Sequence, residues 1–509
     1  MKFLGLGGWD WAILALYLIG MVLLGSRYSR KTHQTKDYYL AGRSMSWIPV
    51  GLSTVAALIS GNTYLGLPSE VRGHGLAFLF LPLSIFFAVP FALRIFLPFY
   101  QQLQVTSAYE YLEKRFDVRV RCLASAMFVL WRLVWIAMIV YVPALAFSAV
   151  TGAPMLYTIV VLGSLTTLYT TLGGIEGVIW TDVVQFFVMF GGTILAIGLI
   201  ASRLEGGLTT IWQTAAAAGR TEWLNLSWDP RVRMTLWGAV LGGSFANLAY
   251  LGVDQVVVQR YLTARSFQDA RRSIILSSAG TWVVVLPLAL LGLALFSFYR
   301  IHPGELPAGM TDDKVFPYFV ASRFPVGLSG LLIAAICAAT MSSLSSGINA
   351  ITTAVDLDFY RRLFGKSSGS PNEQRTAQVR LARRISLLTG GLATFLACFV
   401  GRLGTIIEIA LRVIDGFTGP LLGLFLLGMF SKRANASGAC FGSCLGLLVT
   451  TYVNFWSDLS FTWYPVVGCV TTVLGGTLFS GLGKNSGPAA LQWVYHSERA
   501  AQAARGAEG

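Results

Sequence analysis

The sequence is poor in charged residues. Asp, Glu, Lys and Arg together make up 12% of the 509 residues, whereas hydrophobic residues make up 55%. A soluble protein carries about 25% charged residues, so the composition excludes an ordinary soluble protein and indicates a polytopic membrane protein. Histidine is scarce as well, because the chain has four histidines. Their scattered positions show no metal-ligand spacing, which argues against a histidine metal centre.

Other absences narrow the class further. The chain has no nucleotide-phosphate loop and no nucleophile elbow, so a primary pump or a membrane hydrolase is not expected. The six cysteines show no paired spacing, and we expect packing residues without a disulfide framework. The N-terminus lacks a basic leader and a cleavage site, so the first apolar stretch is expected to remain as a helix. The net charge of +14 does not require a nucleic-acid partner, because membrane proteins concentrate Lys and Arg in cytoplasmic loops.

Long apolar runs are abundant. Crossing a bilayer as a helix takes about 20 residues, and a window of that length finds thirteen candidate spans. They lie near 9–26, 45–68, 76–99, 121–149, 154–172, 178–202, 234–253, 272–299, 327–362, 380–401, 405–430, 436–455 and 462–482. We therefore predict an all-α polytopic membrane protein with thirteen transmembrane helices. The ninth span is too long for one straight crossing and is expected to continue into the cytoplasm.

Positive charges predict the orientation. Lys and Arg concentrate in the segments 27–44, 100–121, 254–272 and 361–384, which are therefore expected to be cytoplasmic. The loop 203–235 also contains arginines, but long loops count less in this rule. The prediction is a protein of the cell (inner) membrane with its N-terminus outside and its C-terminus in the cytoplasm.

A cluster of serines occupies the ninth span. Ser342, Ser343, Ser345 and Ser346 fall within five positions, and this spacing places them on one side of a helix, about one turn tall. Hydroxyls in a membrane need partners, so the cluster is expected to face a cavity or another helix. Hard oxygen ligands stacked in this way suit a small cation such as sodium. Helix packing through small residues is the alternative for this segment taken alone.

Two spans contain residues that interrupt helices. The second span is interrupted at 60–63 and closed by Pro68, and the seventh has a Gly-Gly-Ser interruption at 242–244. Non-helical backbone at membrane depth survives only where it is buried in protein or lines a cavity, and secondary transporters use such breaks for binding. Two interrupted spans five apart suggest a five-plus-five inverted repeat, with spans 2–6 and 7–11 as its halves.

Three charged residues fall inside the eleventh span. Glu408, Arg412 and Asp415 follow the spacing i, i+4 and i+7 of one helix face. Charged side chains within a membrane usually pair with one another. We expect a buried salt-bridge network, with a role in proton coupling as the alternative.

Five motifs resemble the sodium:solute symporter family. They are D-Y-Y-L-A-G-R at 37–43, T-S-A-Y-E-Y-L-E-K-R-F at 106–116, G-G-I-E-G-V-I-W-T-D-V-V-Q at 173–185, D-Q-V-V-V-Q-R-Y-L at 254–262, and the serine segment at 334–353. The resemblance covers all but about the last 25 residues and implies a LeuT-type fold with one extra N-terminal and two extra C-terminal helices. The implied divisions are an N-terminal helix and loop (1–44), a transport core (45–430), two C-terminal helices (431–482) and a cytoplasmic tail (483–509).

The resemblance also implies two sodium sites. The first would use the carbonyls of Ala56, Ile59 and Ala339 with the hydroxyls of Ser342 and Ser343, and the second would use Asp182, Ser342, Ser345 and Ser346. An unpaired carboxylate in a membrane helix costs about 2.5–3.5 kcal/mol, and sodium would neutralise Asp182. A capping or interfacial role is the alternative for Asp182, since Thr181-Asp182 could start a helix. We expect two sodium ions to be co-transported in each cycle.

The solute should bind where spans 2, 4, 7 and 11 meet near the bilayer midplane. The candidate lining residues are Ser60, Gly61, Asn62, Thr63, Arg132, Trp135, Asn247, Tyr250 and Thr418. Relatives that carry sialic acid place an arginine where this chain has Trp135 and a hydroxyl residue where it has Leu58, and both departures argue against sialic acid. Arg132 lies one turn before Trp135, where it could approach an anion or face a neighbouring helix.

The predicted function is sodium-driven import of a small organic solute, and the protein is not expected to be an enzyme. The segments 59–71 and 140–147 look closer to the branch that carries monocarboxylates, vitamins and halide, so a small organic anion is the leading prediction. A neutral sugar or polyol is the alternative, because the side chains of Asn62, Thr63 and Asn247 could hydrogen-bond hydroxyls. Trp135 could stack on a ring face. A passive channel or a sensor-type membrane protein is the alternative from another class.

Overall fold

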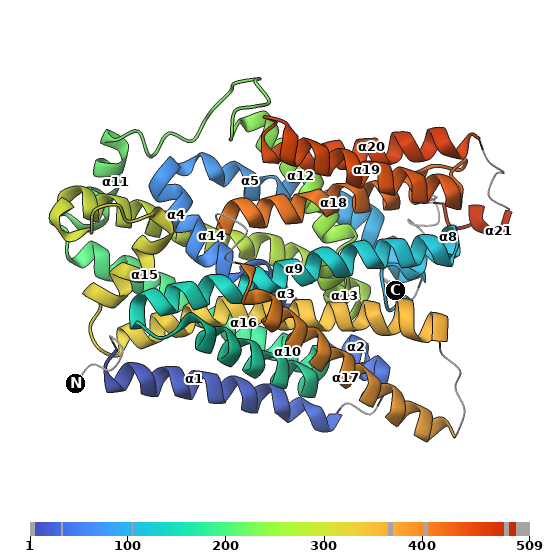
Figure 1. Ribbon diagram of the computed structural model, residues 1–509, viewed down its shortest axis with the longest axis horizontal. Helices are drawn as coiled ribbons and strands as arrows, with labels where there is room; N and C mark the ends of the chain where they lie inside the picture. Colours follow the sequence, from blue (N-terminus) through green and yellow to red (C-terminus); the bar gives the residue numbers. More distant parts are fainter. Residues whose placement is uncertain are drawn as a thin grey trace.

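The computed structural model describes residues 6–31, 34–103, 105–364, 370–400, 406–482 and 488–494. These residues form an elongated bundle of helices, with α1 along one side and α19 and α20 along the opposite side (Figure 1). No β-strand occurs among them, and their only strand-like feature is a bridge between Met45 and Ala264. The predicted all-helical class is therefore confirmed for the described part of the chain.

The helices are labelled in chain order. Their bounds are α1 Gly8–Arg27, α2 Thr35–Leu40, α3 Trp47–Leu58, α4 Gly61–His74, α5 Phe80–Leu83, α6 Ile85–Phe91, α7 Leu97–Leu103, α8 Glu110–Arg115, α9 Val118–Thr151, α10 Met155–Ser202, α11 Gly207–Ala217, α12 Leu236–Gly252, α13 Gln255–Leu262, α14 Phe267–Ile301, α15 Asp312–Arg323, α16 Leu328–Ala354, α17 Pro371–Ala397, α18 Ile406–Phe430, α19 Ala436–Trp456, α20 Tyr464–Ser480 and α21 Pro488–Leu491. A π-helical segment, η6 Val355–Phe364, continues α16 directly. The expectation that the ninth span continues beyond one crossing is thus confirmed.

Judged by length and composition, fewer helices of the described residues qualify as membrane spans than the predicted thirteen. Within the described residues, eight helices are long and apolar enough to cross a membrane, or up to ten if two bent helix pairs each form one span. One reason is α10, whose 48 residues run through two of the predicted spans. It bends at Gly174, where the positive φ of 58° suits glycine. Thirteen spans therefore stays a prediction.

The helix break in the second span lies close to its predicted position. α3 and α4 meet at an angle of 60°, and Ile59 and Ser60 form the break. The Ser60 hydroxyl starts α4 by accepting a hydrogen bond from the Thr63 N–H at 3.2 Å. The prediction that Pro68 closes this span is wrong, because α4 continues through it to His74.

The second predicted break is misplaced. α12 runs unbroken through Gly242, Gly243 and Ser244, and the bend of 48° follows Gly252, between α12 and α13. The two glycines serve close packing instead, since a side chain at Gly242 would collide with the Thr462 carbonyl and one at Gly243 with the Ser84 hydroxyl. Glycine in a membrane helix permits either a break or a close contact, and here it permits contact.

The four basic segments predicted to share the cytoplasmic side contact one another. Arg361 donates to the Thr35 hydroxyl at 3.4 Å, Arg362 pairs with Glu113 at 2.6 Å, and the Gln259 amide donates to the Tyr39 carbonyl at 2.8 Å. These contacts place the segments at the end of the bundle away from the start of α1 (Figure 1). Which side of the membrane that end faces remains a prediction.

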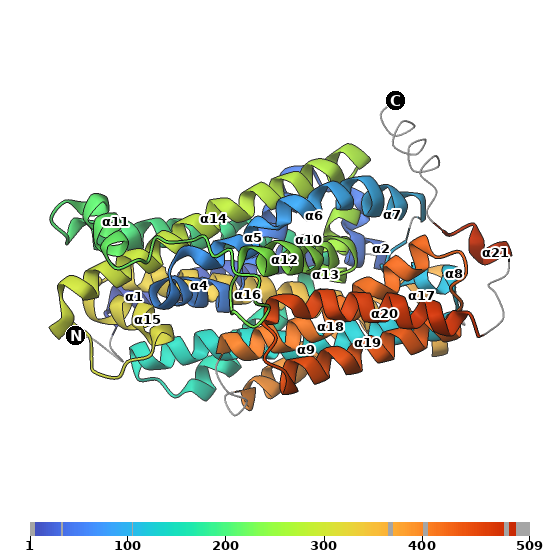
Figure 2. The same cartoon turned by 90° about the horizontal axis from the view of Figure 1, so that it is seen from above.

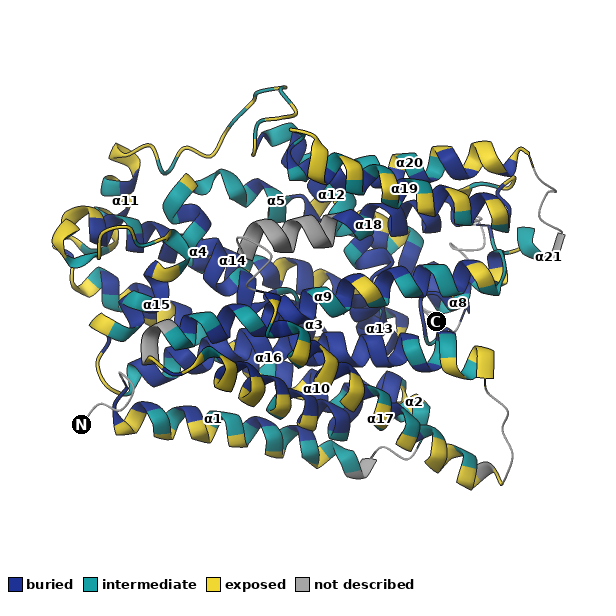
Figure 3. Ribbon diagram, in the orientation of Figure 1, coloured by how far each residue is buried: buried dark blue, intermediate teal, exposed yellow. Residues whose placement is uncertain are grey.

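α16 occupies the centre of the bundle. In the most apolar 18-residue stretch of Leu328–Phe364, 94% of the residues are buried, against 22% in the corresponding stretch of α1. Figure 3 shows the same contrast between α16 and the outer helices. The serines of α16 therefore face protein rather than lipid.

The side chains of Glu408, Arg412 and Asp415 lie outside the described residues. So do residues 365–369 and most of the predicted tail. All six cysteines are free, as expected.

Candidate functional site

The serines of α16 contact the end of α3 where that helix breaks. The last carbonyls of a helix lack helical partners, and at this end two of them accept from serines instead. The Ser342 hydroxyl lies 2.9 Å from the Ala56 carbonyl and 3.2 Å from that of Ala339, and the Ser343 hydroxyl lies 3.0 Å from the Ala57 carbonyl. The structure thus brings four predicted sodium ligands together, although Ser343 meets Ala57 rather than Ala56. Such an array of buried oxygens fits a small hard cation.

Ile59, the fifth predicted ligand of this first ion position, lies at the break itself. Its φ and ψ of −81° and 82° are not helical, and its side chain borders the cavity described below. The carbonyl groups on either side of such a break are the ones that transporters use for ions.

The second predicted ion position centres on Asp182. This carboxylate is fully buried within α10, eight residues beyond the bend at Gly174, so the alternative of a helix cap does not hold. One oxygen, Oδ2, accepts from the Ser53 hydroxyl at 2.6 Å and from the guanidinium of Arg260 at 2.9 Å. The other, Oδ1, has no hydrogen-bond partner within the described part of the chain. That oxygen is available to a cation.

Two further predicted ligands of this position lie on α16. The Ser345 and Ser346 hydroxyls donate to the Ser342 carbonyl at 3.0 and 2.5 Å. Ser346 also accepts a short hydrogen bond from Arg260, and that arginine connects it to Asp182. The three serines of the second position therefore lie together on α16, and Ser346 is linked to Asp182 of α10 through Arg260.

Arg260 and Ser53 were not identified in the sequence. Arg260 entered the sequence analysis only as one basic residue of a loop, whereas its side chain is 1% exposed and pairs with Asp182. It donates to Ser53 at 2.9 Å and to the Val256 carbonyl at 2.8 Å as well. The one available signal was its position among the apolar residues of 256–262, where a lone arginine requires a buried partner.

The first ion position yields a test at Ser343. Ser343→Ala removes one hydroxyl from the break and should raise the sodium concentration for half-maximal uptake by roughly 2- to 10-fold, the effect of losing one neutral polar contact. Sodium titration of initial uptake rates measures this. Ser329→Ala is a matched control, since Ser329 is also buried on α16 but its hydroxyl donates to the Pro325 carbonyl, away from the break. An unchanged sodium dependence in Ser343→Ala would remove this residue from the site.

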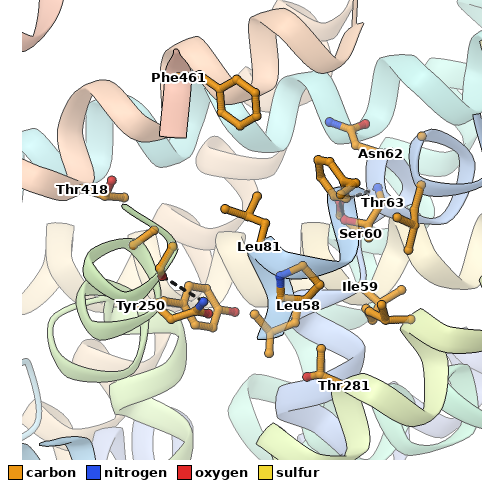
Figure 4. A pocket seen from close by; sticks show the side chains of 18 of the residues that line it. Leu58, Ile59, Ser60, Asn62, Thr63, Leu81, Tyr250, Thr281, Thr418 and Phe461 are labelled. Carbon is orange, nitrogen blue, oxygen red and sulfur yellow. Dashed lines mark hydrogen bonds between the residues drawn. The ribbon is translucent and has the colours of Figure 1, made fainter. Parts of the chain in front are cut away.

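A cavity of about 340 Å³ adjoins the break between α3 and α4. Eight of the nine predicted solute residues line it, namely Ser60, Asn62, Thr63, Arg132, Trp135, Asn247, Tyr250 and Thr418. In Figure 4, Asn62 and Thr63 lie on one side of the cavity and Tyr250 and Thr418 on the other. Gly61 does not line it and lies close to Pro143 and Thr340 instead. This volume is within the usual range for a small-molecule site.

Several polar atoms in the cavity wall are buried without partners. Both amide atoms of Asn62, the hydroxyls of Tyr250 and Thr418, the indole nitrogen of Trp131 and Nε of Arg132 have no hydrogen bond within the described residues. Buried polar groups are normally paired, so these atoms are candidates to bind a solute. The amide of Asn247, in contrast, already donates to the Ser84 hydroxyl at 2.9 Å and to the Gly243 carbonyl at 3.0 Å.

Arg132 lies at the solute cavity and also faces a neighbouring helix, so it meets both expectations drawn from the sequence. Its guanidinium carbon lies 4.2 Å from the ring centre of Trp131 and 4.4 Å from that of Trp135, so two indoles hold the charge. It borders the cavity and also pairs closely with Asp254, which the sequence analysis did not identify. Trp135 is 8% exposed and forms part of both the wall and this aromatic support.

The cavity extends from the break toward the end of the bundle where α1 begins. Glu70, in the second half of α4, borders it, as do Phe78 and Phe461, which lie in the short 3-10 helices Leu76–Leu79 and Phe461–Trp463. Glu70 accepts from Arg233 at 2.8 Å, which attaches the long loop before α12 to this end.

Broken membrane helices, a cluster of oxygen ligands at one break and an adjoining solute-sized cavity define a secondary transporter. Comparison with known proteins specifies the class. The chain belongs to the sodium:solute symporter family, whose model matches residues 38–446. It is therefore a sodium-coupled solute symporter, and sodium is its coupling ion.

The similar proteins carry different solutes. The chain is 33% identical to the sodium/sialic acid symporter SiaT of Proteus mirabilis, over 93% of this chain and 95% of that protein. It is also 33% identical to human sodium-coupled monocarboxylate transporter 1, over 89% of this chain and 74% of that protein. A solved structure of the substrate-bound, outward-open state of a Na⁺-coupled sialic acid symporter matches with a TM-score of 0.87 at 34% identity, covering 94% of this chain and 99% of that one. The names of these proteins agree on sodium coupling, and the family and the structural match support a LeuT-type fold for this chain.

Proposed function

We propose that this symporter imports a small organic anion together with two sodium ions. The observation that carries the proposal is the guanidinium of Arg132 in the cavity wall, with its Nε atom buried and unpartnered. An arginine can only donate hydrogen bonds, and its planar fork matches a carboxylate.

The other unpartnered atoms support an acceptor-rich solute. The indole nitrogen of Trp131 can only donate, and the hydroxyls of Tyr250 and Thr418 can donate as well. Only the carbonyl of Asn62 is limited to accepting. A carboxylate, which accepts several hydrogen bonds and donates none, complements such a wall.

The rest of the wall is apolar and favours a solute with a compact hydrophobic body. Leu58, Leu81, Val285 and Phe461 border the cavity around the polar atoms. A heavily hydroxylated solute would leave several hydroxyls against these side chains without partners, which is costly. This supports a monocarboxylate or vitamin-like acid over sialic acid.

A sugar or polyol remains the second candidate because of Asn62. Its amide offers both a donor and an acceptor to the cavity and uses neither within the protein, a pattern suited to a hydroxyl group. Asn247 supports this candidate less, since its amide hydrogens are already engaged.

The proposal of two sodium ions rests on the two oxygen clusters that share Ser342. One charge moving through 100 mV gains about 2.3 kcal/mol, so two sodium ions gain about 4.6 kcal/mol and an accompanying anion offsets half of it. The contact among the four basic segments supports a common cytoplasmic side, and hence an N-terminus outside.

Transport by purified protein in sealed liposomes tests the function. With sodium outside and potassium inside, we expect labelled lactate, or another monocarboxylate from a panel that includes a vitamin acid, sialic acid and neutral polyols, to accumulate above its outside concentration. Replacing the sodium with potassium should abolish the accumulation. Equilibration without accumulation would indicate a channel, and accumulation of a polyol alone would favour the second candidate.

A further inference from the structure

α13 is a short helix with a buried ion pair at each end. All eight of its residues, Gln255–Leu262, are buried, and it lies in the interior of the bundle beside α12 (Figure 2). It packs against α3 and α16, which carry the first ion position. The segment contains neither glycine nor proline, so it has no residue that would readily absorb a bend.

The first end of α13 contacts the solute cavity. Asp254 caps the helix, since its Oδ1 accepts from the Val256 N–H at 2.9 Å. Its Oδ2 pairs closely with Arg132 in the cavity wall. A solute carboxylate that binds Arg132 therefore competes with Asp254 for the same guanidinium.

The other end of α13 contacts the second ion position. Arg260 occupies Oδ2 of Asp182 at 2.9 Å, and its bond to the Val256 carbonyl ties its side chain to α13 itself. A sodium ion at the free Oδ1 would share the carboxylate with Arg260, and repulsion between the two cations would weaken the hold of Arg260.

We propose that α13 couples sodium binding to solute binding, with Asp254 and Arg260 as the positioning residues. The inference rests on the proposed second sodium position and organic-anion cavity. Sodium at Asp182 weakens the ion pair of Arg260 at one end of α13, and the solute anion weakens the ion pair of Asp254 at the other end. Because both pairs belong to the same helix, the two binding events are linked. Each ligand then lowers the cost of binding the other, and this is a coupling free energy between two sites.

The test uses sodium alone and measures its affinity in purified protein by calorimetric titration, with choline replacing sodium at constant ionic strength. Asp254→Asn keeps a capping side chain and removes the charge that holds α13 to Arg132. We expect sodium to bind more tightly in this variant, by about 5-fold or more, the lower end of usual coupling factors. Asp254 is not an ion ligand in the proposed sites, so a purely structural role would not tighten sodium binding.

Three comparisons make the outcome specific. Asp254→Glu should restore the original affinity, and Asp254→Asn should have no effect when Asp182→Asn is also present. Asp269→Asn is the control, because Asp269 is also a buried carboxylate, lies in the first turn of α14 and pairs with Arg265 at 2.6 Å. If Asp254→Asn does not fold with Arg132 unpaired, the double variant Arg132→Gln/Asp254→Asn removes the same pair, with the same expected result.

The negative outcomes are distinguishable. Sodium affinity that responds to Asp182→Asn but not to Asp254→Asn overturns the coupling role of α13 and leaves the proposed function standing. Sodium binding that Asp182→Asn leaves unchanged overturns the second sodium position and the coupling together.

Discussion

Uptake of an organic anion by the Arg132→Gln variant is expected to fall by about 10- to 100-fold, because a hydrogen bond to a charged group contributes about 1.5–3 kcal/mol. The variant removes the guanidinium that the cavity offers to a carboxylate. Initial rates of labelled lactate uptake under a sodium gradient measure the loss. Sodium binding without solute should persist, since Arg132 is not an ion ligand in the proposed sites.

Controls for this variant follow from its ion pair. Arg132→Gln leaves Asp254 buried without its partner, which costs about 3–5 kcal/mol and could lower the amount of folded protein. The double variant Arg132→Gln/Asp254→Asn removes both charges and should still fail to transport the anion. Arg132→Lys keeps one charge and should retain part of the uptake. Normal anion uptake by the double variant would refute the role of Arg132, and preserved polyol uptake would favour the sugar alternative.

The Asp182→Asn variant is expected to lose its dependence on a second sodium ion. The Hill coefficient for sodium, which cannot exceed the number of sites, should fall from near two to about one. The amide still accepts hydrogen bonds from Ser53 and Arg260. Arg260 loses its buried counter-charge, which costs about 3–5 kcal/mol, so the amount of folded protein is measured alongside. Uptake rates across a sodium titration, at saturating solute, provide the measurement.

Asp10 offers a matched control for Asp182. Asp10 is a buried carboxylate on α1 that accepts from the backbone N–H groups of Gly7, Gly327 and Gly330 at 2.7–2.8 Å. Asp10→Asn should reduce stability without changing the Hill coefficient. A coefficient near one in the unmodified protein would contradict the two-ion proposal.

The sequence predicts the parts of the site that depend on local spacing. The serines of α16 share one face because of their i, i+1, i+3, i+4 positions, and the break at Ser60 follows from a Ser-Gly-Asn-Thr run in an apolar span. The second break was misplaced by ten residues or so because glycines at 242 and 243 are equally suited to close packing.

Ion pairs between distant segments could not be predicted in this way. Arg260 and Asp182 are 78 positions apart, and Arg132 and Asp254 are 122 apart. Nothing in the local sequence specifies which buried arginine meets which carboxylate, because that choice depends on how the helices pack. Asp182 and Arg132 are therefore recognisable in the sequence without the partner of either.

The contact between Arg260 and Asp182 has a consequence for the return half of the transport cycle. A symporter must reset after releasing its cargo, and a bare carboxylate at this depth would make that empty step expensive and sensitive to membrane voltage. The ion pair between Arg260 and Asp182 supplies a balancing charge from the protein itself. We therefore expect the empty carrier to reorient without borrowing a proton or a potassium ion to neutralise this position.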